Sequence, residues 1–275
     1  MVPFFIISVV LALFTIFHWI RWRPYRPKCF YDKSVFLFGH RGAPLLYPEN
    51  SLASFNSAFR CGSDGIELDV QMSQDGHLVV FHDNQLSRMA GVVGRVNKKT
   101  LLELKTIKIK SPDAKSGTME TIPLLNEVLQ NLPNDKLINI EIKSNQIIPG
   151  SIIKKTIRLV KNFDLEDRTI ITCFNPLILL ESKIRAPEII TGLLWQQRGK
   201  KSIVMGPLFW ALFVHADALH LCKESINQKT VQRLNSLGLM LGIWTVNTRK
   251  DFDLTKKWEP TIIISDHPKL IKKWL

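Results

Sequence analysis

The chain has 275 residues, which is enough for one large domain or two small ones. Its 37 lysines and arginines against 24 aspartates and glutamates give a net charge of +13, which favours an anionic partner. No zinc-finger spacing or aromatic–basic signature occurs, so we expect no nucleic-acid partner. An anionic membrane surface or a phosphate-bearing substrate fits better, and a merely solvated basic surface is the alternative. The four cysteines have no paired spacing and are predicted to be free thiols.

Residues 1–22 are predicted to form a single-pass N-terminal membrane anchor. The run Pro3–Ile20 has only three polar interruptions and is about long enough to span a bilayer. A cleaved signal peptide, the alternative, has basic residues before its apolar run, whereas here they follow it. The positive-inside rule then places the rest of the chain on the cytoplasmic side, after a short linker over residues 23–34.

From residue 35 onward, strand-like and helix-like patterns alternate. Of nine strand-like runs, two are joined by the tight-turn signal Asp75-Gly76, which is too short a connection for neighbouring parallel strands. The run after this turn must return antiparallel, and it carries His82 back toward the end of the preceding strand. The other eight runs predict a TIM (β/α)8 barrel over residues 35–275. They lie near Val35, Ile66, Ile138, Thr169, Ile189, Leu219, Leu241 and Ile262.

Two segments do not follow the alternating pattern. Residues 84–121 are polar, basic and turn-rich, and we interpret them as an insertion that forms either a flap over the site or an ordinary surface excursion. Residues 203–214 are apolar on all sides and rich in aromatic side chains, but the segment is too short to span a bilayer. This composition fits a segment that dips into a membrane interface, and it fits a buried barrel helix equally well.

Glu67 and Asp69 give the first chemical signal. They lie two residues apart in an apolar, strand-like run, so both side chains point to one face and repel each other. A divalent cation between them is the simplest way to relieve that repulsion. His40 and His82, one on either side of this run in the sequence, are suited to proton transfer near neutral pH.

A second polar pair, Glu141 and Lys143, lies on one face of the strand-like run Leu137–Lys143. Such residues on the inner face of a barrel strand cost several kcal/mol if they are left without partners. They either form a structural ion pair with each other or belong to the same site as Glu67 and Asp69.

These motifs together resemble the glycerophosphodiester phosphodiesterase family, and the resemblance runs from about Phe36 to the C-terminus. The resemblance implies a TIM barrel that hydrolyses a phosphodiester. The matching motifs, in the order of the family, are His40-Arg41-Gly42, Pro48-Glu49-Asn50-Ser51, Asp64-Gly65-Ile66-Glu67-Leu68-Asp69-Val70, His82-Asp83, Ile140-Glu141-Ile142-Lys143, Trp244-Thr245-Val246-Asn247 and Ser265-Asp266.

The family resemblance also implies roles for these residues. Glu67, Asp69 and Glu141 would hold one divalent cation, and their hard oxygen ligands favour Mg²⁺ or Ca²⁺. His40 and His82 would divide the roles of general base and general acid, and the sequence leaves open which does which.

Four further residues would surround the substrate. Arg41 would pair with the phosphate in a two-pronged way, and Lys143 would add charge stabilisation. Trp244 would line the substrate pocket or, alternatively, cap the core. Glu49 would support Arg41 or the metal shell.

The substrate is predicted to be a lysophospholipid, from which the enzyme would release lysophosphatidic acid. The anchor, the basic charge and the apolar segment 203–214 favour it, and the region 122–143 resembles membrane-anchored members of lysophospholipase D type. The alternative is a soluble glycerophosphodiester, which would give glycerol 3-phosphate and an alcohol. A non-catalytic phospholipid-binding scaffold is a third hypothesis, although none of the expected catalytic residues is missing.

Overall fold

The computed structural model describes residues 6–7, 9–10, 22–110, 117–143, 150–197 and 206–275. Eight parallel strands of these residues close into a barrel, because β1 pairs with both the last strand and β2. This ring confirms the predicted TIM barrel. The strands are β1 (Phe36–His40), β2 (Gly65–Met72), β6 (Leu137–Ile142), β7 (Thr169–Cys173), β8 (Ile190–Trp195), β9 (Ala218–Cys222), β10 (Met240–Trp244) and β11 (Ile262–Ser265).

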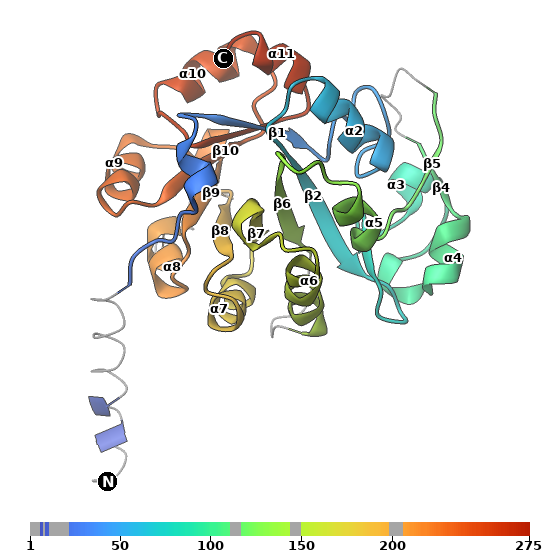
Figure 1. Ribbon diagram of the computed structural model, residues 1–275, viewed down its shortest axis with the longest axis horizontal. Coiled ribbons are helices and arrows are strands. Elements are labelled where there is room, and N and C mark those ends of the chain that lie inside the picture. Colours follow the sequence, from blue (N-terminus) through green and yellow to red (C-terminus); the bar gives the residue numbers. More distant parts are fainter. Residues whose placement is uncertain (1–5, 8, 11–21, 111–116, 144–149, 198–205) are drawn as a thin grey trace.

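Helices surround the barrel on its outer side (Figure 1). They are α2 (Leu52–Arg60), α5 (Leu125–Gln130), α6 (Ser151–Asn162), α7 (Pro176–Arg185), α8 (Pro207–Phe213), α9 (Gln228–Ser236), α10 (Arg249–Lys256) and α11 (Pro268–Lys272), with 3₁₀ turns η1 (Lys28–Tyr31), η2 (Val96–Lys98), η3 (Glu166–Arg168) and η4 (Lys223–Ser225). Ser51 caps the start of α2, since its hydroxyl accepts from the Ser54 amide at 3.1 Å. α5 begins only after Leu124, because Leu124 pairs with Val79 and is held extended.

The register of three neighbouring strands brings the predicted site residues together. β2 lies between β1 and β6, and Glu67 is in register with His40 on one side and Asn139 on the other. Two residues further along β2, Asp69 is in register with Glu141. Because side chains two apart share a face, Glu67, Asp69 and Glu141 all point into the barrel near the carboxyl ends of these strands.

The antiparallel return predicted after β2 is also present. β3 (Leu78–Val80) follows a tight turn with Gly76 at φ +82°, and Val70 lies opposite Val80. The positive φ is the conformation that glycine adopts without strain. His82 therefore comes back to the end of β2 that carries the carboxylates.

The insertion over residues 84–121 packs beside β3, at the right of Figure 1. Its described elements are α3 (Ser87–Ala90), η2, α4 (Leu101–Thr106), β4 (Lys108–Ile109) and β5 (Glu120–Thr121). With β3 they enclose a separate apolar cluster of Val79, Phe81, Leu86, Met89, Val96, Leu104, Ile109 and Ile122. Of its described residues only Asn84 and Gln85 line the central pocket. Most of the described insertion is thus an ordinary excursion with its own core.

The opposite end of the barrel is closed by the segment before β1. Phe30 in η1 is fully buried in an apolar cluster with Phe36 and Phe38 of β1. The backbone amide of Tyr25 donates to Asp217 at 2.7 Å. Much of the predicted linker 23–34 is therefore packed against the barrel.

Two predictions concerned membranes. None of the described helices is both long enough and apolar enough to cross a bilayer, and most of the predicted anchor 1–22 lies outside the described residues. In segment 203–214 the described part forms α8, on which Phe209 and Phe213 are 43% and 44% exposed. Ala211 of the same helix is fully buried. α8 thus packs on the barrel with one face and leaves aromatic side chains on the other.

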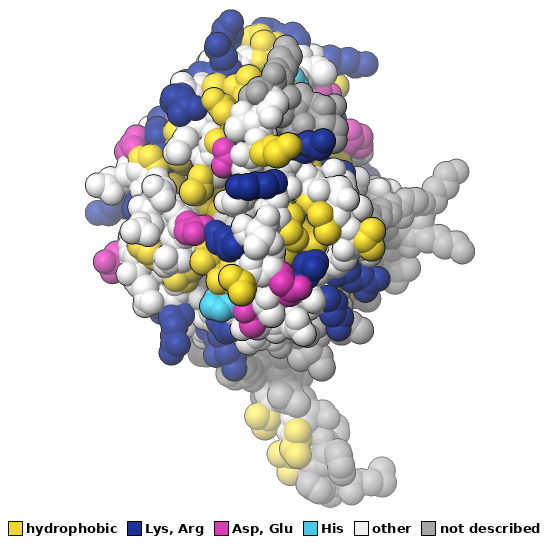
Figure 2. All heavy atoms as spheres, turned by 90° about the vertical axis from the view of Figure 1, so that its right-hand side faces the viewer, with side chains coloured by type: hydrophobic (Ala, Val, Ile, Leu, Met, Phe, Trp, Pro, Cys, Tyr) yellow, Lys and Arg dark blue, Asp and Glu magenta, His cyan; other side chains and the backbone are white. Residues whose placement is uncertain are grey.

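The positive charge is dispersed over the face of the molecule that Figure 2 shows. Figure 2 views the molecule from the right-hand side of Figure 1 and shows lysine and arginine side chains spread over that face among hydrophobic and acidic ones. The four cysteines are free, as predicted. On this face, therefore, the net charge of +13 forms no single patch.

Candidate active site

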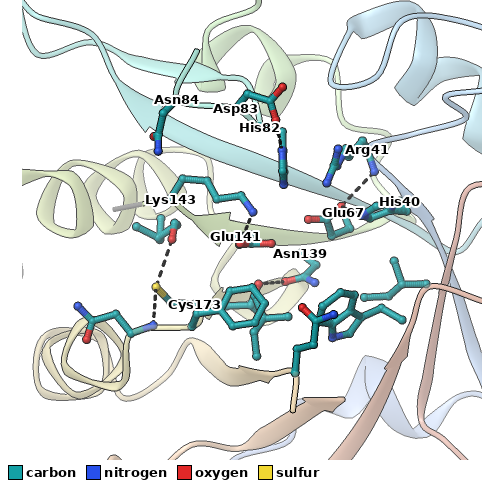
Figure 3. Close-up of a pocket in the computed structure, with 18 of the residues that line it drawn as sticks. His40, Arg41, Glu67, His82, Asp83, Asn84, Asn139, Glu141, Lys143 and Cys173 are labelled. Carbon is teal, nitrogen blue, oxygen red and sulfur yellow. Dashed lines mark hydrogen bonds and ion pairs between the residues drawn. The ribbon is translucent and has the colours of Figure 1, made fainter. Parts of the chain in front are cut away.

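A cavity of about 840 Å³ opens at the carboxyl ends of the barrel strands. Seven of the nine predicted site residues line it: His40, Arg41, Glu67, His82, Glu141, Lys143 and Trp244. The other two lie just behind, with Asp69 1% exposed beneath Arg41 and Lys143, and Glu49 against Arg41. Figure 3 shows His40, Arg41, Glu67, His82, Glu141 and Lys143 converging from different strands and loops.

Three buried carboxylates form the floor of this pocket. Glu67, Asp69 and Glu141 are 3%, 1% and 8% exposed, and one oxygen of each lies within 4.8 Å of the others. Like charges this close in a poorly solvated site oppose one another strongly.

The pKa values of these carboxyl groups are shifted by burial and by the neighbouring charges. Burial raises the pKa of Glu67 well above its usual range, and the charges of Asp69 and Glu141 raise it further. Burial, together with Asp69, raises the pKa of Glu141 to about 7. Burial acts in the same direction on Asp69, but Lys143 and Arg41 outweigh it and lower that pKa below its usual range. Two of the three carboxyls therefore resist ionisation unless a further positive charge lies between them.

The donor set fits a divalent cation. Asp69 Oδ1 is buried 3.1 Å from Lys143 Nζ, and it receives no hydrogen bond from any described residue. An unsatisfied carboxylate oxygen and two carboxyls with raised pKa values are the features that a bound cation would resolve. All the ligands are oxygens, the type that Mg²⁺ and Ca²⁺ prefer.

Arg41 is held against the carboxylates by its backbone and its side chain. Its φ of 53° lies in the left-handed region, and this turn aims its amide at Glu67 Oε2, 3.0 Å away. Its Nη1 donates to Glu49 Oε1 at 3.0 Å, and its Nε lies 3.2 Å from Asp69 Oδ2. Two of its three nitrogens thus face carboxylates. The predicted two-pronged phosphate contact would use the remaining N–H groups of Nη1 and Nη2 or displace one of these carboxylates.

Lys143 directly follows β6 and is surrounded by acids. Its Nζ lies 2.5 Å from Glu141 Oε1 and 3.1 Å from Asp69 Oδ1. Burial disfavours the charged amine, but Asp69 and Glu141 outweigh it and raise the pKa of Lys143. Lys143 and Glu141 therefore form an ion pair and also belong to the same site as Glu67 and Asp69, so both interpretations of this pair are correct.

His40 is oriented by a carboxylate from the last strand–helix loop. Its Nδ1 is 2.6 Å from Asp266 Oδ1, and Asn247 Nδ2 donates to the other oxygen of Asp266 at 2.6 Å. Burial raises the pKa of Asp266, but the bond with His40 outweighs it and holds the pKa low. His40 Nε2 then faces the pocket, 3.9 Å from Glu67 Oε2.

His82 is oriented in the same way by its neighbour. Its Nδ1 is 2.6 Å from Asp83 Oδ1, and Arg88 Nε donates to Asp83 Oδ2 at 2.6 Å. Arg88 also reaches Glu49, with Nη2 at 2.5 Å and Nη1 at 3.0 Å. Burial lowers the pKa of His82, and the nearby charge of Arg41 lowers it further. An ionic chain therefore links the second histidine to the arginine of the pocket.

One wall of the pocket is apolar. Trp244 donates its indole N–H to the carbonyl of His220 at 3.1 Å and meets Phe174 edge-on, with ring centroids 5.9 Å apart. Phe174 is 43% exposed at the pocket mouth. Trp244 therefore lines the pocket and is also fixed by the core.

Sequence reasoning gave no role in the site to five residues that hold it. Four of them, Asn50, Asp83, Asn247 and Asp266, stood inside quoted motifs without a role. Asn50 in fact donates to Asp69 Oδ2 at 2.8 Å and accepts from the Asp69 amide at 3.2 Å. Arg88 comes from the insertion, and no sequence signal pointed to it.

Two histidines fixed by aspartates, next to an arginine and a lysine, are suited to acid–base chemistry on an anionic ester. Fold and site together define a TIM-barrel hydrolase. The glycerophosphoryl diester phosphodiesterase family matches residues 40–270, and the chain belongs to this family. It is an enzyme, a phosphoric diester hydrolase.

Known relatives agree along most of the chain. A glycerophosphodiester phosphodiesterase of Caldanaerobacter subterraneus is 36% identical over 236 residues, which is 86% of this chain and 95% of the relative. The solved glycerophosphodiester phosphodiesterase of Thermotoga maritima has a TM-score of 0.69 at 28% identity, covering 88% of this chain and 98% of that one. An Oleispira antarctica phosphodiesterase, solved with the product sn-glycerol-3-phosphate, has a TM-score of 0.75 at 25% identity and covers 86% and 95%.

Proposed function

We propose that the chain hydrolyses soluble glycerophosphodiesters to glycerol 3-phosphate and an alcohol. The observation that carries the proposal is the single pocket in which His40 and His82 lie beside Arg41, Lys143 and the carboxylate floor. The name of the C. subterraneus relative and the product bound to the O. antarctica relative favour this substrate class over a lysophospholipid.

In the proposed reaction the cationic side chains hold the diester. Lys143, kept protonated by its acidic neighbours, and Arg41 attract the phosphate into the pocket. His40 and His82 then divide two proton transfers, one from the attacking hydroxyl or water and one to the departing alcohol. Each ring is already fixed by an aspartate at Nδ1, so its Nε2 is the atom that exchanges the proton.

We also propose that Glu67, Asp69 and Glu141 hold one divalent cation, Mg²⁺ or Ca²⁺. When bound, it would neutralise charge on a phosphate oxygen and lower the pKa of the nucleophile. Its loss would leave the three carboxylates opposed to one another and to an incoming anion.

The test is turnover of glycerophosphocholine with Mg²⁺, with Ca²⁺ or after chelation. Wild type is expected to be active with at least one metal and inactive in chelator, and Glu67→Gln with Glu141→Gln should lose turnover with either metal. A Lys154→Gln variant on the outer helix α6 is the matched control and should behave as wild type. Full activity in chelator would sink the metal proposal, and no turnover under any condition would sink the substrate proposal.

A lysophospholipid is the second candidate, and the apolar wall with the exposed Phe174 is the observation that favours it. If it is the substrate, lysophosphatidylcholine in vesicles should be turned over faster than glycerophosphocholine, and Phe174→Ser should slow only the lipid reaction. Equal loss on both substrates would assign Phe174 a structural role and leave the soluble diester as the substrate.

We keep as a proposal that residues 1–22 anchor the enzyme with its barrel on the cytoplasmic side. Removal of residues 1–21 preserves the packed segment from Tyr25 onward, so the barrel should still fold and hydrolyse glycerophosphocholine. Full-length protein should sediment with membranes. Protease added outside intact cells should leave the barrel uncut, and protease should cut it once the cells are broken open. Recovery of full-length protein in the supernatant would overturn the proposal.

A further inference from the structure

A second cavity lies on the outside of the barrel and shares no lining residue with the catalytic pocket. It has a volume of about 670 Å³ and lies between the end of α2, the loop after β1 and the C-terminal helix α11. Figure 1 shows α2 and α11 both at the top of the molecule, next to β1. Its polar lining is dominated by Arg60, Lys269, Lys272 and Lys273. A volume of this size is typical of small-molecule sites.

Within the described part of the chain, these four cations have no acidic partners. No salt bridge joins Arg60, Lys269, Lys272 or Lys273 to a carboxylate of any described residue. All four side chains are exposed, whereas the half-buried Lys183 is matched by Asp217 at 2.6 Å. Four like charges around one cavity repel one another, and an anion between them would relieve that repulsion.

The cationic cavity continues into an apolar one. A neighbouring cavity of about 420 Å³ shares Leu46, Cys61, Lys269 and Lys273 with it. The apolar lining comes from Ala43, Leu45, Leu46, Pro268 and Leu270. Leu46 and Leu270 are 38% and 36% exposed, so apolar surface is left in contact with water. Removal of that surface from water would favour binding of a hydrocarbon chain.

The polarity of the two cavities sets the direction of a ligand. The far end of the apolar cavity is bounded by Asp266, whose carboxylate already holds His40 and Asn247. A negative head group is repelled there and attracted to the end formed by Arg60 and Lys272. The aliphatic stem of Lys272 passes over Gly62, where an added Cβ would be 3.3 Å from its Cγ.

We infer that the two cavities form one binding site for a single anionic amphiphile, a phosphate monoester carrying an alkyl or acyl chain. The phosphate lies among the four cations and the chain lies against Leu45, Leu46 and Leu270. None of the residues that line the catalytic pocket lines either cavity, so binding here does not depend on the proposed hydrolysis.

The test is titration calorimetry of the full-length protein with dodecyl phosphate kept below its micelle concentration. Arg60→Gln with Lys272→Gln should weaken binding by about tenfold or more, since each removes a charge-assisted contact. Lys154→Gln with Lys229→Gln removes the same charge from two exposed positions on α6 and α9 and should bind as wild type. Unchanged affinity in the first variant would overturn the site.

Further probes separate the head group from the chain. Inorganic phosphate and glycerol 3-phosphate test the head alone, dodecyl maltoside tests the chain alone, and all three should bind at least tenfold more weakly than dodecyl phosphate. Leu270→Gln should weaken dodecyl phosphate and leave inorganic phosphate unchanged. Equal affinity for inorganic phosphate and dodecyl phosphate would show a simple anion site and would overturn the inference that the ligand is an amphiphile.

Two controls complete the experiment. If the Arg60→Gln with Lys272→Gln variant does not fold, Lys269→Gln with Lys273→Gln removes two of the same cations from the exposed side of α11 and should show the same loss. Vesicles of phosphatidylglycerol test the membrane as the source of the phosphate. If the protein binds the vesicles through these residues but does not bind monomeric dodecyl phosphate, the ligand is a membrane surface and not a single amphiphile. That result would overturn the inference.

Discussion

The two ends of the barrel are built from the same strands but differ in polarity. At one end Phe30, Phe36 and Phe38 fill the interior with apolar side chains that are at most 4% exposed. At the other end β1 finishes at His40, beside carboxylates whose charges oppose one another. As is typical of this fold, the residues that stabilise the barrel lie at the amino ends of the strands, and the residues suited to catalysis lie at the carboxyl ends.

The largest expected effect is on catalysis. His40→Ala and His82→Ala should each lower kcat/KM by about 10²- to 10⁴-fold on glycerophosphocholine, because each removes one proton transfer. Stability should change little, since both rings are partly exposed at the pocket. Measured rates and urea unfolding curves check both parts.

A diester with a good leaving group assigns the roles of the two histidines. From a p-nitrophenyl phosphodiester the leaving group, p-nitrophenolate, departs without protonation. The variant that lacks the general acid should therefore recover most of its loss, and the variant that lacks the base should not. Recovery by neither variant would contradict the division of roles between them.

The next largest effect is on stability at the other end of the barrel. Phe30→Ala should cost about 3 kcal/mol in the free energy of unfolding, because it leaves a cavity in the apolar cluster. The activity of the folded fraction should be unchanged. The neighbouring Tyr31 is 66% exposed, so Tyr31→Ala is the matched control and should cost less than about 1 kcal/mol. Equal costs for the two variants would show that η1 does not close the barrel.

Between the two ends lies a buried histidine that couples stability to pH. His220 is fully buried in space left by Gly192 and Gly242, where a Cβ on Gly242 would lie 2.6 Å from its ring. Neither ring nitrogen has a hydrogen-bond partner among the described residues, and burial lowers its pKa to about 4. The folded protein therefore keeps this ring neutral.

The sign of the effect follows from the two pKa values. Above pH 6.5 the ring is neutral in both states, and His220 does not change stability with pH. As the pH falls from 6.5 toward 4, the unfolded chain takes up a proton that the folded protein does not, so about 3 kcal/mol of stability is lost. His220→Leu should flatten the unfolding free energy over this range relative to wild type. Parallel curves for the two proteins would contradict the neutral buried ring.

The catalytic end was predictable from sequence where local geometry decides the outcome. Glu67 and Asp69 share a face because strands have a period of two, and the short turn forces His82 back beside them. Phe30 was not predictable, because its burial depends on the shape of the closed barrel. Arg88 was not predictable either, because its approach to Glu49 depends on how the insertion packs around a core of its own.

The smallest expected effect concerns this unpredicted arginine. Arg88 bridges Asp83 and Glu49, so Arg88→Gln should loosen the carboxylate that orients His82. We expect kcat to fall about tenfold with little change in KM, because a positioning residue does not contact the substrate. Arg158→Gln, on the exposed side of α6, should leave kcat unchanged.

A double variant decides whether Arg88 acts through Asp83. If it does, Asp83→Asn and Arg88→Gln together should cost little more than Asp83→Asn alone, since residues in one network are not additive. Independent, multiplicative losses would place Arg88 in contact with the substrate or in a purely structural role. The non-additive result would extend the site from the strand ends into the insertion. The carboxyl end of the barrel would then depend on a residue outside the barrel, whereas the amino end is closed by the apolar cluster around Phe30.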